Sequence, residues 1–189
     1  MPSKRQRQPG FLQAVVASAL IVGVLFLVRG VETTFHLRLE RFGVIPRNVY
    51  GLPGILFSPL LHANLNHLIA NSVPFFVLLV LLLANPEYHP WRTLSMIWII
   101  SGCGIWLIGR GNATHIGASS VIFGLAAFLI TAGFYAKSWR SVFVAILVFI
   151  CYGGIFYGAL PQPGPISWEG HLSGAIAGIW LARNWGASR

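Results

Sequence analysis

Long apolar runs separated by short polar segments dominate this chain. Six of these runs are long enough for spanning helices, and proline, glycine and charged residues fill the segments between them. Residues 29–60, rich in arginine and proline, are too polar to span a membrane. We therefore predict an all-α membrane protein, a single domain over residues 1–189 built as a bundle with spans at about 11–28, 66–84, 93–108, 119–135, 141–159 and 169–185.

Three local signals refine this picture. Asn64 precedes the second run and is a candidate N-cap residue. The segment His36–Phe42 has the composition of a short amphipathic helix lying at the membrane interface. The run Phe11–Val28 could be a signal peptide, but it is long for one and no small-x-small cleavage site follows it, so a first spanning helix is favoured.

Composition excludes the main soluble classes. Hydrophobic residues make up 56% of the chain, charged residues only 9%, and the mean hydropathy is +0.71, which is typical of a polytopic membrane protein. The formal net charge of +9 does not indicate nucleic-acid binding, because the basic residues lie at the ends of apolar runs and form no long basic face.

The same basic residues predict the orientation. Six spans place both termini on one side, and the basic tail 1–10 lies there. No organelle-targeting segment precedes the first span, so we expect a bacterial inner membrane with both termini cytoplasmic. Of the 13 lysines and arginines, that side would hold Lys4, Arg5, Arg7, Arg92, Lys137, Arg140, Arg183 and Arg189.

Four polar side chains are predicted to share one depth. With the termini inside, the second, fourth and sixth spans all begin at the outer face. His67 and Asn71 lie in the first two turns of the second span, Ser119 begins the fourth, and His171 lies at the start of the sixth. A histidine is costly in lipid, so its position there indicates a functional site.

Two stripes of small residues predict which helices approach closely, since such stripes let membrane helices pack at short distance. Ser119 and His171 each lie one residue from a stripe, so contact between the stripes would bring them together. Packing alone is the simpler interpretation of either stripe taken by itself. The stripes consist of Gly117, Ser120, Gly124, Ala127 and Thr131 on the fourth span, and of Gly170, Gly174 and Gly178 on the sixth.

These groups suit acyl transfer. A serine hydroxyl is a weak nucleophile and needs a base within hydrogen-bond reach, which makes Ser119 the candidate nucleophile and His171 the candidate general base. Glu169 is two residues before His171 and points away from it on a helix, so we expect a dyad rather than a triad. The Ser119 backbone N–H at a helix N-terminus, with His67 and Asn71 on one face of the second span, would complete an oxyanion hole.

The motifs His62-x4-His67-x3-Asn71, Gly117-Ala118-Ser119 with Gly124, and Gly170-His171 with Gly174 and Gly178 resemble those of the rhomboid intramembrane serine proteases. The resemblance covers nearly the whole chain and implies a six-helix rhomboid-like bundle that cleaves the transmembrane segments of other proteins. It implies Ser119 as nucleophile, His171 as base, and His67 and Asn71 as oxyanion donors.

The chain departs from the family pattern at two positions. Ser120 replaces the glycine that usually follows the nucleophile, which makes Ser120 a rival nucleophile, although its place on the small stripe favours Ser119. Phe123 stands where the family often has tyrosine, and its ring could pack on His171.

Other interpretations remain open. A non-catalytic rhomboid-like binder of membrane helices is the leading alternative, and a transporter or channel is disfavoured by the lack of intramembrane carboxylates and inverted repeats. A zinc site among His62, His67, His115 and His171 is disfavoured because no HExxH motif is present. We expect no cofactor and no metal, and as partners the lipid bilayer and transmembrane protein substrates.

Overall fold

The computed structural model describes residues 10–135, 138–164 and 166–187. The predicted basic tail, apart from Gly10, lies outside these residues, as do Lys137 and Arg189. Across the described residues the chain forms seven α-helices: α1 (Phe11–Thr34), α2 (Gly54–Phe57), α3 (Leu65–Leu83), α4 (Pro90–Ile108), α5 (Ser119–Tyr135), α6 (Trp139–Tyr152) and α7 (Trp168–Ala187). Short 3-10 helices connect them: η1 (Leu39–Phe42), η2 (Val49–Gly51), η3 (Ser58–Leu60), η4 (Pro86–Tyr88) and η5 (Gly153–Ala159).

Four stretches of the described part are long and apolar enough to cross a membrane, namely α1, α3, α4 and the segment formed by α6 with η5. They indicate a multi-pass integral membrane protein, so the prediction of an all-α membrane protein is confirmed. α5 is apolar but has only 17 residues, and α7 carries Glu169, His171 and Ser173 near its start. A crossing by all six long helices therefore stays a prediction.

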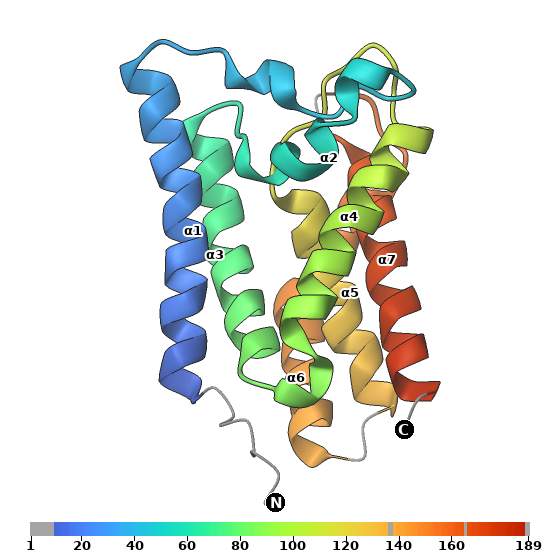
Figure 1. Cartoon of the computed structure of the whole chain (residues 1–189). Coiled ribbons are helices and arrows are strands. Elements are labelled where there is room, and N and C mark those ends of the chain that lie inside the picture. The colour runs from blue at the N-terminus through green and yellow to red at the C-terminus, as the bar shows by residue number, and fades with distance from the viewer. Residues whose placement is uncertain (1–9, 136–137, 165, 188–189) are drawn as a thin grey trace, which may run out of the picture.

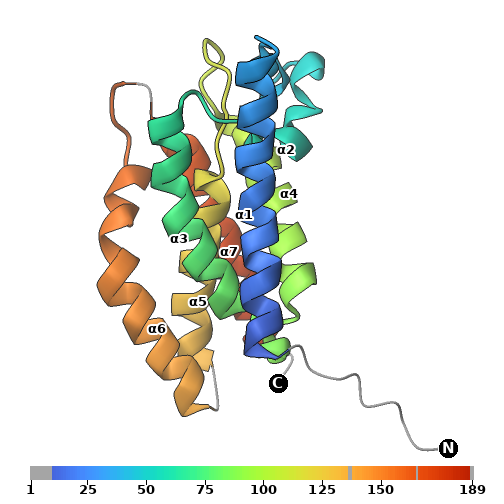
Figure 2. The ribbon, with the colours of Figure 1, turned by 90° about the vertical axis from the view of Figure 1, so that its left-hand side faces the viewer.

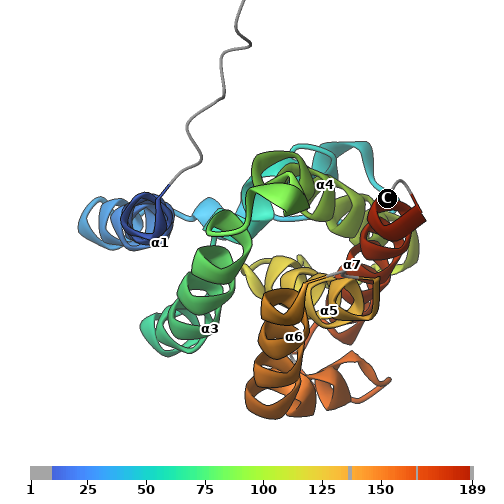
Figure 3. The same ribbon diagram turned by 90° about the horizontal axis from the view of Figure 1, so that it is seen from below.

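α5 forms the centre of the bundle. It packs most extensively against α7 and also contacts α3, α4 and α6, an arrangement that Figure 3 shows from below. Its side chains are buried on nearly every face, so the other helices shield it from lipid. α1 lies at the edge of the bundle (Figures 2 and 3), packs mainly on α3, and turns most of its apolar side chains outward.

The predicted helix boundaries hold best for α5, which covers 119–135, and less well for α1, which continues past residue 28 to Thr34. The added turn is polar but internally satisfied. Arg29 pairs with the buried Glu32 at 2.6 Å, and the second carboxylate oxygen of Glu32 accepts from the Leu39 N–H at 3.1 Å. The helix can therefore extend beyond its apolar run without leaving a buried charge unpaired.

Two further elements differ from expectation. Of the predicted interfacial helix His36–Phe42, only η1 at Leu39–Phe42 is helical, because His36 adopts a positive φ of 52° that ends the helical path after α1. The fifth predicted span, 141–159, is α-helical only to Tyr152 and then tightens into η5, which begins at the pair Gly153-Gly154.

Candidate active site

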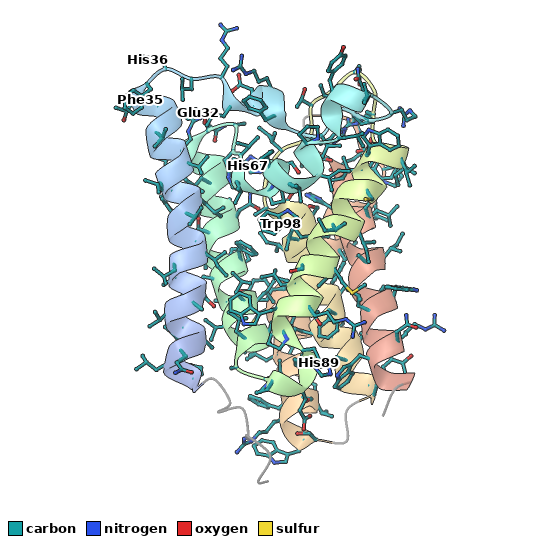
Figure 4. All side chains as sticks on the ribbon, in the orientation of Figure 1. Glu32, Phe35, His36, His67, His89 and Trp98 are labelled. Carbon is teal, nitrogen blue, oxygen red and sulfur yellow. The ribbon has the colours of Figure 1, made fainter. Side chains whose placement is uncertain are left out.

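A cavity of about 610 Å³ opens at one end of the bundle, between α3, α5 and α7. Ser119, His171, His67 and Asn71 all line it. The cavity lies at the end where α3, α5 and α7 begin, which is opposite to the end where α1 begins and α7 ends (Figure 1). Figure 4 shows His67 near this end and His89 near the other. The structure thus brings together four side chains that are far apart in the sequence.

Ser119 is the first residue of α5, and Ser120 is the second. The Ala118 carbonyl accepts the first helical hydrogen bond, from Ile122 at 3.0 Å, so the N–H groups of Ser119 and Ser120 have no partner within α5. Ser119 is half-buried and lines the cavity, whereas Ser120 is only 3% exposed and does not. This difference favours Ser119 over Ser120 as the nucleophile.

The loop before Ser119 is fixed to the segment that precedes α3. Gly117 donates its N–H to the Ser58 carbonyl at 2.8 Å, and Val44 and His115 exchange two backbone hydrogen bonds. Gly117 has a φ of 112°, a conformation that L side chains rarely adopt. A side chain there would also collide with the His67 ring, because an added Cβ would lie 2.7 Å from His67 Cε1. Glycine is therefore required at this position both by its backbone conformation and by the close approach of α3.

The donors on α3 face this same loop. The position of a Cβ on Gly117 lies 2.9 Å from His67 Nε2 and 3.7 Å from Asn71 Nδ2. The Asn71 amide donates one hydrogen to the His67 carbonyl at 3.1 Å, which fixes its orientation and leaves its second N–H available to the cavity. Asn64 caps α3 as predicted, accepting from the His67 N–H at 2.8 Å. The cap fixes where the helix starts and hence the depth of His67 and Asn71.

His171 is oriented by two groups from outside its own helix. Its Nδ1 lies 2.9 Å from the Gly158 carbonyl oxygen, which can only accept, so Nδ1 carries the hydrogen and Nε2 of the neutral ring is free to act as a base. The Phe123 ring stacks on the imidazole at 4.0 Å with an angle of 12° between the planes. Among the described residues no hydrogen bond joins Ser119 and His171, as is common before a substrate is bound.

α5 and α7 approach closely where the small stripes meet. A Cβ on Gly174 would overlap the Ser120 carbonyl oxygen, and one on Gly178 would overlap the Gly124 carbonyl oxygen. Gly170 and Gly117 belong to the predicted stripes but not to this contact, because Gly170 faces Ser167 and Ile105, and Gly117 faces His67. The contact between the two helices therefore begins at Ser120 and Gly174, just beyond Ser119 on α5 and about one turn beyond His171 on α7.

Two other histidines lie outside the spanning helices. His62 is 3% exposed, and its ring meets that of His67 edge to face with centroids 5.1 Å apart. Burial, followed by the nearby His67, lowers the pKa of His62 to about 4. Burial likewise lowers the pKa of His115, so both rings are neutral at pH 7. Across residues 10–135, 138–164 and 166–187, no three His, Cys, Asp or Glu side chains are grouped to hold a metal ion.

Sequence reasoning missed several residues that build the site. The Gly158 carbonyl carries no side-chain signal, and only its place in η5 reveals its role beside His171. Glu169 is 1% exposed, and its Oε1 lies 2.9 Å from Nε of Arg110. The sequence did contain a signal for this ion pair. Arg110 and Glu169 are single charges of opposite sign, one just after the third predicted span and one at the start of the sixth, and both positions were expected at the outer face.

Comparison with known proteins gives one family. The family described as "Rhomboid domain" matches residues 49–186. An uncharacterized protein of Mycobacterium tuberculosis is 40% identical over 185 residues, which are 93% of this chain and 77% of the relative. An uncharacterized protein of Mycobacterium leprae is 36% identical over 170 residues, which are 85% of this chain and 67% of that relative.

A more distant relative comes from a virus. A protein of Acanthamoeba polyphaga mimivirus that is named for the rhomboids is 33% identical over 129 residues, which are 62% of this chain and 66% of the viral protein. No solved structure matches the chain significantly.

Proposed function

We propose, since the chain belongs to the rhomboid family, that it is a serine endopeptidase that cleaves the transmembrane segments of other membrane proteins. One observation carries the proposal. Ser119, at the free N-terminus of α5, shares a cavity with His171, whose Nδ1–H is held by the Gly158 carbonyl so that Nε2 can accept a proton. A helix-binding protein without catalysis needs neither this tautomer nor a partly exposed serine in the same cavity.

The reaction follows from these positions. His171 Nε2 takes the proton of the Ser119 hydroxyl as Oγ attacks the scissile carbonyl carbon, and the carbonyl oxygen becomes an oxyanion. The proposed donors to this charge are the backbone N–H of Ser119, the second N–H of the Asn71 amide, and His67. The imidazolium then returns its proton to the leaving amine, and water hydrolyses the acyl-enzyme with His171 again as base.

The backbone carbonyl of Gly158 takes the place that a carboxylate occupies in a Ser-His-Asp triad. It fixes the tautomer and direction of His171 but adds no negative charge. The Phe123 ring, stacked on the imidazole, limits its rotation from the other side. Together these contacts support a dyad mechanism in which orientation is supplied by the backbone and by an apolar ring.

The proposal extends to substrate and placement. All six long helices cross the bilayer, with both termini in the cytoplasm of a bacterial cell and the cavity opening toward the outer face, where water can enter. A substrate helix hides its carbonyls in hydrogen bonds, so it must unwind locally before Ser119 can reach one. Substrates therefore carry helix-weakening and small residues near the outer end of a transmembrane segment.

The proposal is tested with purified protein in lipid vesicles that contain a model single-span substrate. Wild type should cleave the substrate near the outer end of its span, and Ser119→Ala should not. Ser72→Ala is the matched control, because Ser72 is a buried serine that bonds only its own helix, to the Leu68 carbonyl at 2.7 Å. Equal cleavage by Ser119→Ala and wild type would exclude the proposed nucleophile, and binding of the helix without cleavage by wild type would favour the non-catalytic alternative.

A further inference from the structure

An ion pair joins the loop that leads into α5 to the first turn of α7. Arg110 lies between α4 and α5, and Glu169 is the second residue of α7. Arg110 Nε lies 2.9 Å from Glu169 Oε1, and the side chain of Glu169 is 1% exposed while that of Arg110 is 32% exposed. Because a buried carboxylate needs a partner of opposite charge, Arg110 holds the Glu169 side chain in place.

Arg110 uses its whole guanidinium group for this junction. Nη1 donates to the Gly164 carbonyl at 3.0 Å and Nη2 donates to the Ile166 carbonyl at 2.5 Å. The two Nη atoms therefore bind the segment that leads into α7 by hydrogen bonds, and Nε is in ion-pair contact with α7 itself through Glu169. A lysine could supply the charge but not these two directed hydrogen bonds together with the ion pair.

A second bridge runs parallel to the first. His115 donates its Nε2–H to the Arg110 carbonyl at 3.2 Å, so Nδ1 of the neutral ring accepts from the Ser167 hydroxyl at 2.6 Å. The carbonyl of Ser167 in turn accepts the backbone N–H of His171 at 3.1 Å. The loop that ends at Ser119 is thus hydrogen-bonded to the turn that carries His171.

We propose that Arg110, His115, Ser167 and Glu169 form an outer clamp that sets the spacing of Ser119 and His171, with Arg110 and Glu169 as positioning residues for the reaction. This inference rests on the proposed protease function. Arg110, His115 and Ser167 also line the catalytic cavity, so the outer clamp forms part of its wall.

The outer clamp has a task that helix packing does not perform. The glycine contacts hold the bodies of α5 and α7 together from Ser120 and Gly174 inward. They do not fix the loop before α5 or the first turn of α7, where the remaining freedom would move His171 relative to Ser119. Because a displacement of about 1 Å can cost roughly 100-fold in rate, loss of the outer clamp lowers kcat more than it lowers the stability of the bundle.

The test measures the rate at which a fluorophosphonate labels the folded protein, together with kcat and KM for a model transmembrane substrate and the melting temperature. We expect Arg110→Lys and Glu169→Gln each to slow labelling and kcat by about 10-fold or more, with KM nearly unchanged. The double variant Arg110→Lys/Glu169→Gln should be little slower than either single variant, because the pair acts as a unit. Arg47→Gln is the matched control, since Arg47 also donates to a backbone carbonyl near this end of the bundle, that of Leu107 at 2.9 Å, but lines no part of the cavity.

Two results would overturn the outer clamp. One is labelling of both single variants at the wild-type rate. The other is a loss of labelling that matches the loss of folded protein, which would mean that the pair serves stability alone. Either result leaves the proposed function intact as long as the wild type is labelled at Ser119. Failure of the wild type to be labelled there would reject the proposed function instead.

Discussion

The two sides of the catalytic cavity are packed in opposite ways. On one side, α5 and α7 touch backbone to backbone, with Gly174 against Ser120 and Gly178 against Gly124. On the other side, α3 packs on α1, α4 and α5 but makes no substantial contact with α6 in the described part of the chain. Figures 2 and 3 both show α3 between α1 and α6.

The difference separates two requirements of the proposed reaction. The dyad needs a fixed distance, which a contact between backbones provides because it has no side-chain freedom. A substrate helix needs a way in, and the α3–α6 side has cavity-lining residues, Pro74 and Ile155, at its edge with exposed apolar side chains such as Val73 and Ile150 beside it. Variants on the two sides should therefore have different effects, and variants in the cavity the largest effect of all.

The largest effect is expected for His171→Ala. Removal of the base should lower cleavage by about 10⁴-fold or more, because Nε2 of His171 is the proposed acceptor of the Ser119 proton. The melting temperature should stay near that of wild type, since His171 is not part of the glycine contacts between α5 and α7. Cleavage assays beside thermal unfolding would check both, and substantial cleavage by a folded His171→Ala protein would contradict the dyad.

The next largest effect is expected on the side of the cavity where α5 and α7 touch. Ser120→Leu should lower cleavage by roughly 100-fold or more, because the longer side chain would force α7 away from α5 and separate Ser119 from His171. Ser120→Gly and Ser120→Ala should keep activity, since both are small enough for the contact. Full activity of Ser120→Leu would mean that the close approach of α5 and α7 does not determine the distance between Ser119 and His171.

An intermediate effect is expected for Asn71→Ala. Loss of one side-chain donor should reduce kcat by about 100-fold at most, because backbone N–H groups remain, and KM should change little. Steady-state kinetics on the folded fraction would measure this, with Ser72→Ala as the neighbouring control. If Asn71→Ala instead lowers the melting temperature and leaves kcat unchanged, Asn71 is structural.

A smaller effect is expected on the α3–α6 side of the cavity. Val73→Trp, at a position 63% exposed on α3, should raise KM for a helical substrate about several-fold and leave the labelling rate with a small fluorophosphonate unchanged. Ile176→Trp, at a position 54% exposed on α7, is the matched control and should change neither. Equal effects of the two substitutions on KM would remove the distinction between the sides.

The smallest effect concerns pH and His62. The folded state holds the pKa of His62 at about 4 against an ordinary value of 6.5, so the unfolded chain takes up the proton first. Its stabilising contribution is complete above pH 6.5 and is lost as the pH falls toward 4. His62→Gln should therefore reduce the fall in melting temperature between pH 7 and pH 4.5 by roughly 5 °C, whereas the exposed His36→Gln should not. If the melting temperature of His62→Gln falls as much as that of wild type over this pH range, the conclusion that His62 is buried as a neutral ring is wrong.

Much of the fold was predictable because burial in a membrane leaves a strong pattern. The start and end of α5 and the cap at Asn64 follow from apolar run length and from one side chain. The extension of α1 to Thr34 was not predictable, since it depends on Glu32 meeting both Arg29 and the Leu39 N–H after the chain has folded back.

The candidate site likewise contains residues that could be predicted from the sequence and residues that could not. Ser119, His171, His67 and Asn71 could be named because polar side chains at one depth of a membrane helix are rare. The contribution of Gly158 could not be predicted, because a backbone carbonyl has no sequence signature and its direction depends on the change from α6 to η5. Arg110 and Glu169 were visible as charges, but only the folded chain places them 2.9 Å apart.

The central claim, that Ser119 is the nucleophile and His171 its base, is tested most directly by locating a fluorophosphonate adduct by mass spectrometry. The account predicts one adduct, on Ser119, present in wild type and in Ser120→Ala and absent from Ser119→Ala, with labelling at least about 100-fold slower in His171→Ala. An adduct on Ser120, or labelling of Ser119 at an unchanged rate without His171, would contradict it.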